Sequence, residues 1–292
     1  MLNELYTKIE VTGLYKPVRL MQISDLHLTL ADERDDAYAN EHQIGRTQCF
    51  SRPGVPGAPA QLREMMAYAQ DKCVDRIVLT GDILDFPSVP NLELLKEQLS
   101  GSGIPYFYIY GNHDWNYPRD MEQAAVKMRN TPLFKELLGG DASARAVDLG
   151  ALILIGLDNS DYQFTDAQVD FTEAQLAAGK PCMIFFHVPL YIDTLLEDTM
   201  RVWQRSILAG TPPVCNKNDW GAAATEATMR MCRLLRKADT PLIGAAAGHV
   251  HFNHEDYLTY GVCPLLKNRG RKQYVTDVGA FGTVRVFDVV PA

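Results

Sequence analysis

The sequence predicts an α/β protein with layered sheets, and three patterns indicate this class. Short segments rich in β-branched and aromatic residues alternate with longer segments that carry apolar residues at helical spacing. Polar residues follow most of the short segments directly. Near the C-terminus the short segments succeed one another without helices, which favours a largely parallel sheet with an antiparallel ending.

The individual elements follow from these patterns in chain order. Six short apolar runs are predicted to be central strands: residues 18–23, 76–79, 105–110, 151–157, 182–186 and 242–246. Five intervening segments are predicted to be helices: residues 60–73, 92–99, 120–128, 166–178 and 223–238. The C-terminal strands are expected at residues 257–260, 273–278 and 283–289.

Two segments, residues 30–59 and 193–221, fit neither class. The first is polar and then rich in Gly and Pro, and the second carries Trp203, Trp220 and a Thr-Pro-Pro turn. Long irregular insertions in a compact domain are usually functional or disordered. We interpret residues 1–292 as one domain whose insertions either cover a substrate pocket or only decorate the surface.

The composition is that of a globular protein with an acidic balance. The 292 residues include 28 Lys plus Arg and 36 Asp plus Glu, which gives a net charge of -8. Such a charge disfavours broad binding to nucleic acid or to an anionic membrane. The longest apolar stretch, residues 149–157, is far shorter than the roughly 20 residues that cross a bilayer, so no membrane span is expected.

Compartment is indicated by the N-terminus and by the cysteines. The first residues lack the charged and apolar regions of a secretory signal, so we expect a cytoplasmic protein. The six cysteines are scattered without a CxxC pair, which favours reduced thiols over a disulfide framework or a structural zinc site.

The placement of histidines is the main functional signal. Five of the seven histidines come just after a predicted strand: His27, His113, His187, His249 and His251. The carboxyl ends of strands in layered α/β proteins meet at the ligand crevice, so these side chains are expected to converge. Carboxylates and an amide occupy the same context: Asp25, Asp82, Asp85 and Asn112.

Each of these motifs alone is weak evidence. An isolated Asp25-x-His27 at a strand end is more often a hydrogen-bonded turn than a metal site, and His187 after two phenylalanines could be a core histidine. Burying the whole set at one sheet edge would cost several kcal/mol per unpaired charge. A bound cation would compensate that cost, so the set predicts a metal site.

The order Asp25-x-His27, Gly81-Asp82-x-x-Asp85, Gly111-Asn112-His113-Asp114, His187 and Gly248-His249-Val250-His251 resembles the calcineurin-like metallophosphoesterase superfamily. The resemblance implies a four-layer αββα sandwich with two mixed sheets flanked by helices. It also implies two divalent or mixed-valence transition metal ions. Nitrogen and oxygen ligands fit Mn, Fe or Zn without selecting among them.

The resemblance also implies the ligands of each ion. One ion would be held by Asp25, His27, Asp82 and His251, and the other by Asp82, Asn112, His187 and His249. Asp82 would then bridge the two.

A dinuclear site of this kind hydrolyses phosphate esters, with attack by a metal-bridging hydroxide. By resemblance, His113 is the general acid that protonates the leaving group, and Asp85 orients it. The alternative for Asp85 is a simple turn residue. Arg46 and Arg52 in the first insertion could contact a distal phosphate of a small-molecule substrate.

The pattern is closest to small bacterial-type phosphodiesterases, including class III cyclic nucleotide phosphodiesterases. Purple acid phosphatases carry a tyrosine where this chain has Asp85, which disfavours that branch of the superfamily. A phosphodiesterase is therefore favoured over a phosphomonoesterase or pyrophosphatase on the same site. A non-catalytic scaffold of this fold would lack ligands, and none is missing here.

Overall fold

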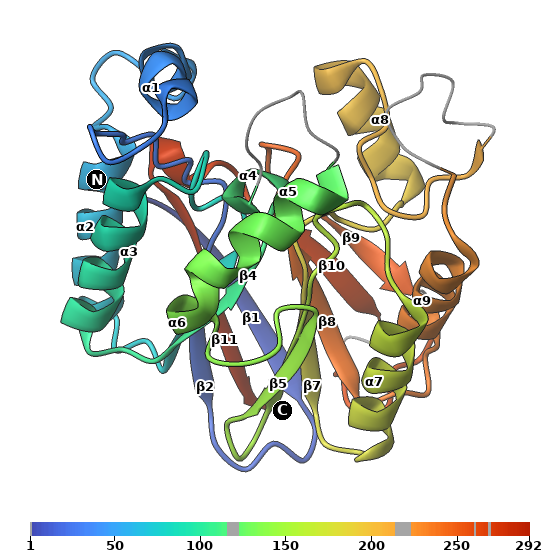
Figure 1. Cartoon of the computed structure of the whole chain (residues 1–292). Helices are drawn as coiled ribbons and strands as arrows, with labels where there is room; N and C mark the ends of the chain where they lie inside the picture. The colour runs from blue at the N-terminus through green and yellow to red at the C-terminus, as the bar shows by residue number, and fades with distance from the viewer. Residues whose placement is uncertain (1, 116–122, 214–222, 260, 268–269) are drawn as a thin grey trace.

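The computed structural model describes residues 2–115, 123–213, 223–259, 261–267 and 270–292. Two β-sheets lie face to face in the centre, and helices cover their outer faces (Figure 1). This is the four-layer αββα sandwich that the resemblance implies, and both sheets are mixed.

The first sheet has five strands in the order β1-β11-β2-β3-β4. Its strands are β1 (Asn3–Val11), β11 (Thr283–Pro291), β2 (Val18–Ile23), β3 (Arg76–Thr80) and β4 (Tyr106–Ile109). The strands β2, β3 and β4 are parallel, whereas β11 runs antiparallel to β2. The carboxyl ends of three strands therefore lie at one edge.

The second sheet has six strands in the order β5-β6-β7-β8-β10-β9. Its strands are β5 (Ala144–Asp148), β6 (Ile153–Leu157), β7 (Cys182–Phe185), β8 (Leu242–Ala247), β10 (Arg271–Val275) and β9 (His254–Thr259). The four inner strands are parallel, and the two edge strands are antiparallel to their neighbours.

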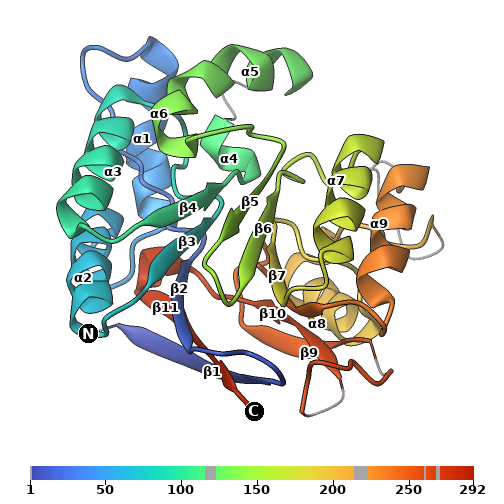
Figure 2. The ribbon, with the colours of Figure 1, turned by 90° about the horizontal axis from the view of Figure 1, so that it is seen from below.

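Helices pack on both sheets through apolar side chains. On the first sheet lie α2 (Ala58–Asp71) and α3 (Val89–Ser102), and on the second lie α7 (Asp166–Ala177) and α9 (Glu226–Arg236) (Figure 2). Neighbouring residues of one strand serve different layers: Met21 packs under the helices, whereas Leu20 faces the core between the sheets. This alternation is what a strand buried on both faces requires.

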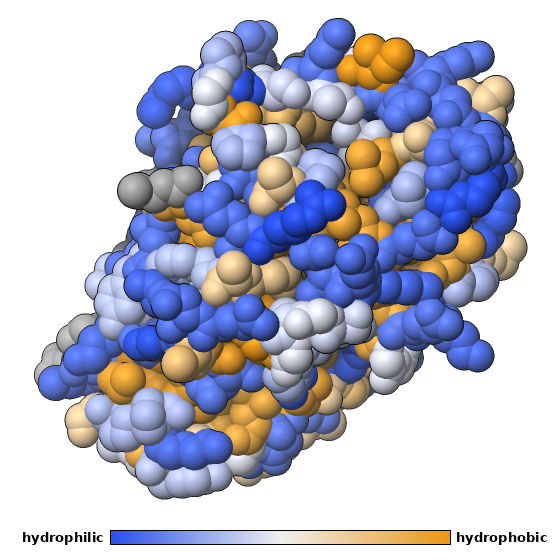
Figure 3. All heavy atoms as spheres, turned by 90° about the vertical axis from the view of Figure 1, so that its left-hand side faces the viewer, coloured by the Kyte–Doolittle hydropathy of each residue, from blue (hydrophilic) through white to orange (hydrophobic). Residues whose placement is uncertain are grey.

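Further helices and turns connect these elements. They are α1 (Ala37–Cys49), α4 (Asn112–Trp115), α5 (Gln123–Asn130), α6 (Lys135–Leu138), α8 (Asp193–Trp203) and two 3-10 turns at Thr131–Phe134 and Gly279–Phe281. Among them, α1 and α8 lie at the upper edge of Figure 1. On the side that α2 and α3 cover, hydrophilic and apolar residues are interspersed (Figure 3). No helix in the described part of the chain is long and apolar enough to cross a membrane.

The predicted central strands are all present, with ends within two residues of the expected ones. The predicted helices are present within three residues, although residues 120–122 lie outside the described part. Two strands were not predicted: β1 and β5 are edge strands whose partly exposed, polar-interrupted sequences give only a weak strand signal.

One expectation from the sequence is wrong. The insertions are not irregular throughout, because the first contains α1 and the second contains α8, whereas residues 214–221 lie outside the described part. The antiparallel ending is confirmed, since β9 is antiparallel to β10 and β11 is antiparallel to β2. The ending is divided between the two sheets, because the turn at Gly279–Phe281 leads β11 into the first sheet, where it also runs parallel to β1.

Candidate metal centre

Nine polar side chains expected from the sequence lie on loops that meet at one edge of the two sheets. Backbone hydrogen bonds join these loops, for example from Asp25 to the Gly81 carbonyl and from Gly248 to the His187 carbonyl. The site residues are Asp25 and His27 after β2, Asp82 and Asp85 after β3, Asn112 and His113 after β4, His187 after β7, and His249 and His251 after β8.

Backbone strain is concentrated on these loops. Five of the nine residues have positive φ angles between 49° and 72°, namely Asp25, His27, Asp82, His249 and His251. Non-glycine residues rarely adopt this left-handed region, and each instance costs on the order of 1 kcal/mol or more. The surrounding structure therefore imposes conformations that turn the side chains toward one another.

Two glycines make the close approach of the loops feasible. A Cβ atom on Gly81 would lie 2.4 Å from the Gly111 nitrogen, and Gly81 also has a φ of 89°. A Cβ atom on Gly248 would lie 1.7 Å from Ser24 Oγ and 2.3 Å from Asp25 Oδ2. Any side chain at these positions would push the loops apart.

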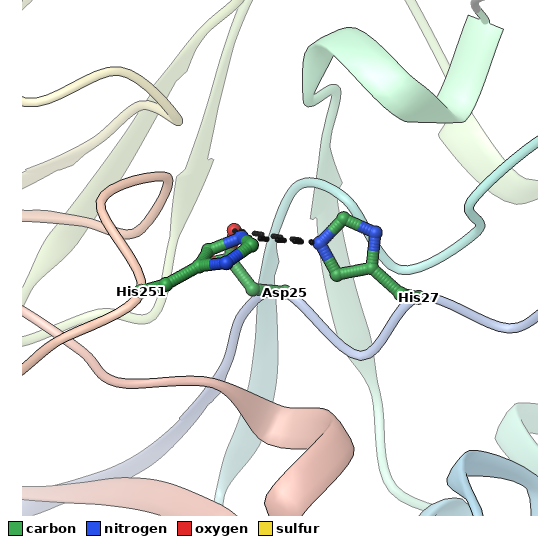
Figure 4. Close-up of side chains that lie close together, drawn as sticks. All are labelled: Asp25, His27 and His251. Atoms are coloured by element: carbon green, nitrogen blue, oxygen red, sulfur yellow. Dashed lines mark hydrogen bonds and ion pairs between the residues drawn. The ribbon is translucent and has the colours of Figure 1, made fainter. Parts of the chain in front are cut away.

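Asp25, His27 and His251 form the first cluster that could hold a metal ion. His251 Nε2 lies 3.2 Å from Asp25 Oδ1 and 3.2 Å from His27 Nε2 (Figure 4). Ser24 and the His249 backbone donate hydrogen bonds to the Asp25 carboxylate and fix its orientation. The three ligand atoms thus converge on one point.

The second cluster consists of Asp82, His187 and His249, all buried. His187 Nε2 lies 3.3 Å from Asp82 Oδ2 and 3.1 Å from His249 Nδ1. The other ring nitrogen of His187 lies 2.8 Å from the Thr80 carbonyl, which fixes its tautomer with the proton on Nδ1. His27 Nε2 lies 3.9 Å from Asp82 Oδ2, so Asp82 stands between the two clusters.

The histidine pair carries opposite pKa shifts. Burial disfavours the charged form of His187, but the Asp82 carboxylate outweighs it and raises the pKa of His187 to about 9. Burial and the charge on His187 lower the pKa of His249 to about 3. A metal ion binds only a deprotonated imidazole nitrogen, so metal binding here would displace a proton from His187.

Asn112 provides the test of whether the site fits a metal. Its Oδ1 atom is buried and has no hydrogen-bond partner within the protein. An unsatisfied buried acceptor costs about 1–3 kcal/mol, so such an atom indicates a missing partner. Together with carboxylate oxygens and imidazole nitrogens, this orphan oxygen is the donor set of a borderline divalent metal.

A third group surrounds Asp85, which is almost fully buried. Asp85 Oδ1 lies 2.9 Å from His27 Nδ1 and 3.2 Å from His113 Nδ1. Arg46 donates two hydrogen bonds of 2.7 Å to the same carboxylate. Burial opposes ionisation, but Arg46 and the two histidines outweigh it and hold the pKa of Asp85 well below its usual range. Asp85 is therefore more than a turn residue.

Sequence reasoning did not assign two residues to the site that nevertheless shape it. Asp114 accepts backbone hydrogen bonds from Asp82, Leu84 and Gly111 and so holds the β3 and β4 loops together. Its place in the Gly-Asn-His-Asp motif was the available signal. For Arg46 the sequence left open a contact with a distal phosphate or a solvated loop, and no local pattern indicated its contact with Asp85.

Both insertions reach the site through aromatic rings. Phe50 stacks on His27 with ring centroids 3.9 Å apart, and Trp203 lies edge-on to His251 at 5.5 Å. The first ring follows α1 directly, and the second ends α8. The described parts of the insertions are thus in contact with candidate ligands.

The family model for the calcineurin-like phosphoesterases matches residues 18–251, which is most of the chain. The chain belongs to this family. The matched region contains all nine site residues, and the fold and the paired Asp/His clusters agree with it.

Solved structures with the same fold include two phosphatases. A dimetal phosphatase from Danio rerio has a TM-score of 0.54 and 12% identity, with 90% of this chain and 88% of that chain covered. A purple acid phosphatase from yellow lupin seeds has a TM-score of 0.54 and 15% identity, with 93% and 45% covered. At these identities the likeness shows the fold alone. Among curated proteins, none matches this calcineurin-like phosphoesterase.

Proposed function

We propose that this calcineurin-like phosphoesterase is a metal-dependent hydrolase that prefers phosphodiesters of small molecules. The observation that carries the proposal is the convergence of two Asp/His clusters on either side of Asp82, with His113 beside them. A non-catalytic scaffold of this fold would not need a complete set of ligand candidates. It would also not need strained loops or a buried Asn112 oxygen without a hydrogen-bond partner.

Two metal ions are assigned to the two clusters. In this proposal Asp25, His27, Asp82 and His251 hold one ion, and Asp82, Asn112, His187 and His249 hold the other. Both are transition metals such as Mn, Fe or Zn, to which mixed nitrogen and oxygen ligands are suited. When bound, such ions lower the pKa of water toward neutrality and neutralise negative charge on the phosphate.

His113 is proposed to protonate the leaving alkoxide. Its side chain is 31% exposed, so the ring can meet a substrate, whereas Asp85 beneath it is 2% exposed. Burial opposes protonation, but Asp82 and Asp85 outweigh it and raise the pKa of His113 to about 9. The contact of His113 Nδ1 with the Asp85 carboxylate favours the protonated ring that a general acid needs.

The partners of two arginines support the preference for diesters. A monoester dianion carries one more negative charge than a diester and needs an additional cation. Arg46 is bound to Asp85, and Arg52 lies over the Phe281 ring at 3.5 Å. Both side chains thus have partners within the protein. A phosphomonoesterase or pyrophosphatase on the same site is the alternative, and a cytoplasmic location stays a prediction.

The experiment compares kcat/KM for bis-p-nitrophenyl phosphate and p-nitrophenyl phosphate after reconstitution with Mn. The Asp82→Asn variant serves as the blank because it removes the carboxylate between the clusters. We expect diester hydrolysis to dominate and to vanish in the variant. Faster hydrolysis of the monoester would establish the alternative, and equal rates for wild type and variant would refute a metal hydrolase.

A further inference from the structure

We infer that Arg46, which lies in the first insertion, is a positioning residue for the proton donor: its guanidinium locks the Asp85 carboxylate that orients His113 and His27. The inference rests on the proposed function, in which His113 protonates the leaving group. It assigns to an insertion helix a part in the chemistry of a site built otherwise from strand-end loops.

Arg46 donates a hydrogen bond to each oxygen of the Asp85 carboxylate. Nε donates to Oδ2 and Nη2 donates to Oδ1, each at 2.7 Å. The planar guanidinium matches a carboxylate in this fork, so the contact resists rotation of the carboxylate as well as its displacement. Arg46 is 34% exposed whereas Asp85 is 2% exposed, so the guanidinium lies on the solvent side of the buried carboxylate.

The orientation of Asp85 matters because one of its oxygens serves two rings. Oδ1 lies 2.9 Å from His27 Nδ1 and 3.2 Å from His113 Nδ1. A proton on each Nδ1 atom leaves Nε2 of both rings for other partners. Rotation of the carboxylate would displace Oδ1 from both rings, whereas the second contact of His113 Nδ1, 3.3 Å from the Asp85 main-chain carbonyl, would stay in place. The Arg46 fork opposes this rotation.

Helix α1 is held in place partly by contacts that do not involve Arg46, although the Arg46 guanidinium also lies 5.3 Å from the centroid of the Phe50 ring. The Asp36 side chain caps its first turn, and the hydroxyls of Thr47 and Thr29 lie 2.7 Å apart. Phe50 follows the helix and stacks on the face of His27, with an interplanar angle of 10°. These contacts fix the helix on the loop after β2, which makes Arg46 a preorganised partner of Asp85.

Two variants separate positioning from simple docking of the helix. Arg46→Met removes the fork and keeps most of the side-chain stem. Thr47→Val removes the hydroxyl contact to Thr29, one residue further along the same helix, and leaves Asp85 untouched. Arg46→Lys retains the charge without the fork, so we expect it to recover only part of what Arg46→Met loses.

The first readout is the dependence on leaving group in Mn-loaded protein, with methyl p-nitrophenyl phosphate and methyl phenyl phosphate as matched diesters. We expect Arg46→Met to lower kcat about tenfold or more for the poorer phenolate leaving group and by less than about threefold for p-nitrophenolate. Any effect of Thr47→Val on kcat should be the same for the two diesters. A higher KM with unchanged kcat for Arg46→Met would show that Arg46 binds substrate and would overturn the inference.

The second readout does not depend on activity. In Zn-loaded protein with 15N-labelled histidine, the Nδ1 proton of His113 should exchange slowly because Asp85 accepts it, and His113→Gln assigns the signal. We expect exchange at least about tenfold faster in Arg46→Met and unchanged in Thr47→Val. An unchanged signal in Arg46→Met would overturn the inference. If the signal responds but wild type hydrolyses neither diester, the positioning stands and the proposed function fails.

Discussion

The histidines of the site differ in which ring nitrogen contacts an oxygen of the protein and which remains for another partner. His187 and His27 each direct Nδ1 to an oxygen of the protein and Nε2 toward the other side chains of their own cluster. His113 shares the partner of His27 but is exposed on its other side. In the proposed function, this difference separates the candidate ligands His27 and His187 from the candidate proton donor His113.

This distinction gives a prediction for His113→Ala. We expect two metal ions per chain to remain, because none of the contacts within the two clusters involves the His113 ring. Turnover should fall on the order of a hundredfold or more, mainly for alkyl esters with poor leaving groups. Steady-state rates on p-nitrophenyl and alkyl esters check this expectation. An equal loss on both would count against a proton donor at this position.

Residue types at strand ends could be predicted from the sequence, whereas contacts across the chain could not. The candidate ligands were recognisable because Asp, Asn and His follow apolar runs. The Arg46–Asp85 pair joins residues 39 positions apart, and nothing local to residue 46 marks it. The role of Asp114 as an acceptor of three backbone N–H groups likewise depends on how two loops meet.

At the scale of the elements, the loops after β2, β3 and β8 carry the strain that shapes the site. Their glycines permit contacts that no other residue allows, as at Gly248 beside Ser24 and Asp25. Helix α1 was missed because its sequence is polar and interrupted by Gly45, and only Ala39 is buried within it. Tertiary contacts rather than an apolar face hold this helix.

The loop after β8 provides a second prediction. Gly248→Ala should weaken metal binding at the first cluster by at least about tenfold, because an added Cβ displaces the Asp25 carboxylate. Gly103→Ala is the matched control: Gly103 also has positive φ, at 67°, but nothing lies within 4 Å of its added Cβ. That control should lose only about 1 kcal/mol of stability. Metal titration measures the affinity of both variants. Equal affinities of Gly248→Ala and Gly103→Ala for the metal would contradict the steric account.

The cross-strand pair of Arg19 on β2 and Asp288 on β11 gives a prediction about pH. Arg19 contacts both carboxylate oxygens at 2.6 and 2.8 Å, and this lowers the pKa of Asp288. A lowered folded pKa stabilises the protein above the unfolded value near 3.9 and loses that effect as pH falls through the folded value.

Asp288→Asn should therefore lower the free energy of unfolding by about 1 kcal/mol at pH 7, and the difference should shrink below about pH 4. Urea denaturation of wild type and variant at both pH values tests this. A difference that stayed constant with pH would show that the charge of Asp288 is not responsible.

For the whole molecule, the two sheets bring their carboxyl edges together. The first sheet supplies Asp25, His27, Asp82 and Asn112, and the second supplies the remaining ligand candidates. The inner strands and the four covering helices could be predicted because their apolar patterns are regular. The edge strands β1 and β5 could not, because they leave little local signal, and although β11 was predicted as a strand, its place between β1 and β2 depends on long-range pairing.

Metal removal should therefore loosen the contact between the sheets. A ligand present at a hundred times its dissociation constant stabilises the folded state by about 2.7 kcal/mol per site. We expect chelation followed by Mn addition to raise Tm by roughly 5 °C or more in wild type and by about half as much in His187→Ala, which keeps the first cluster. Differential scanning calorimetry measures the change in Tm for wild type and for His187→Ala. An equal rise in both proteins would place the stabilising ion elsewhere.

The central claim is that the two Asp/His clusters, divided by Asp82, bind two metal ions. It is tested most directly by counting metal per chain in Mn-reconstituted, desalted protein by elemental analysis, for wild type and Asp82→Asn. We expect two ions per chain in wild type and a clear loss in the variant. Fewer than one ion per wild-type chain, with no change on substitution, would contradict the account.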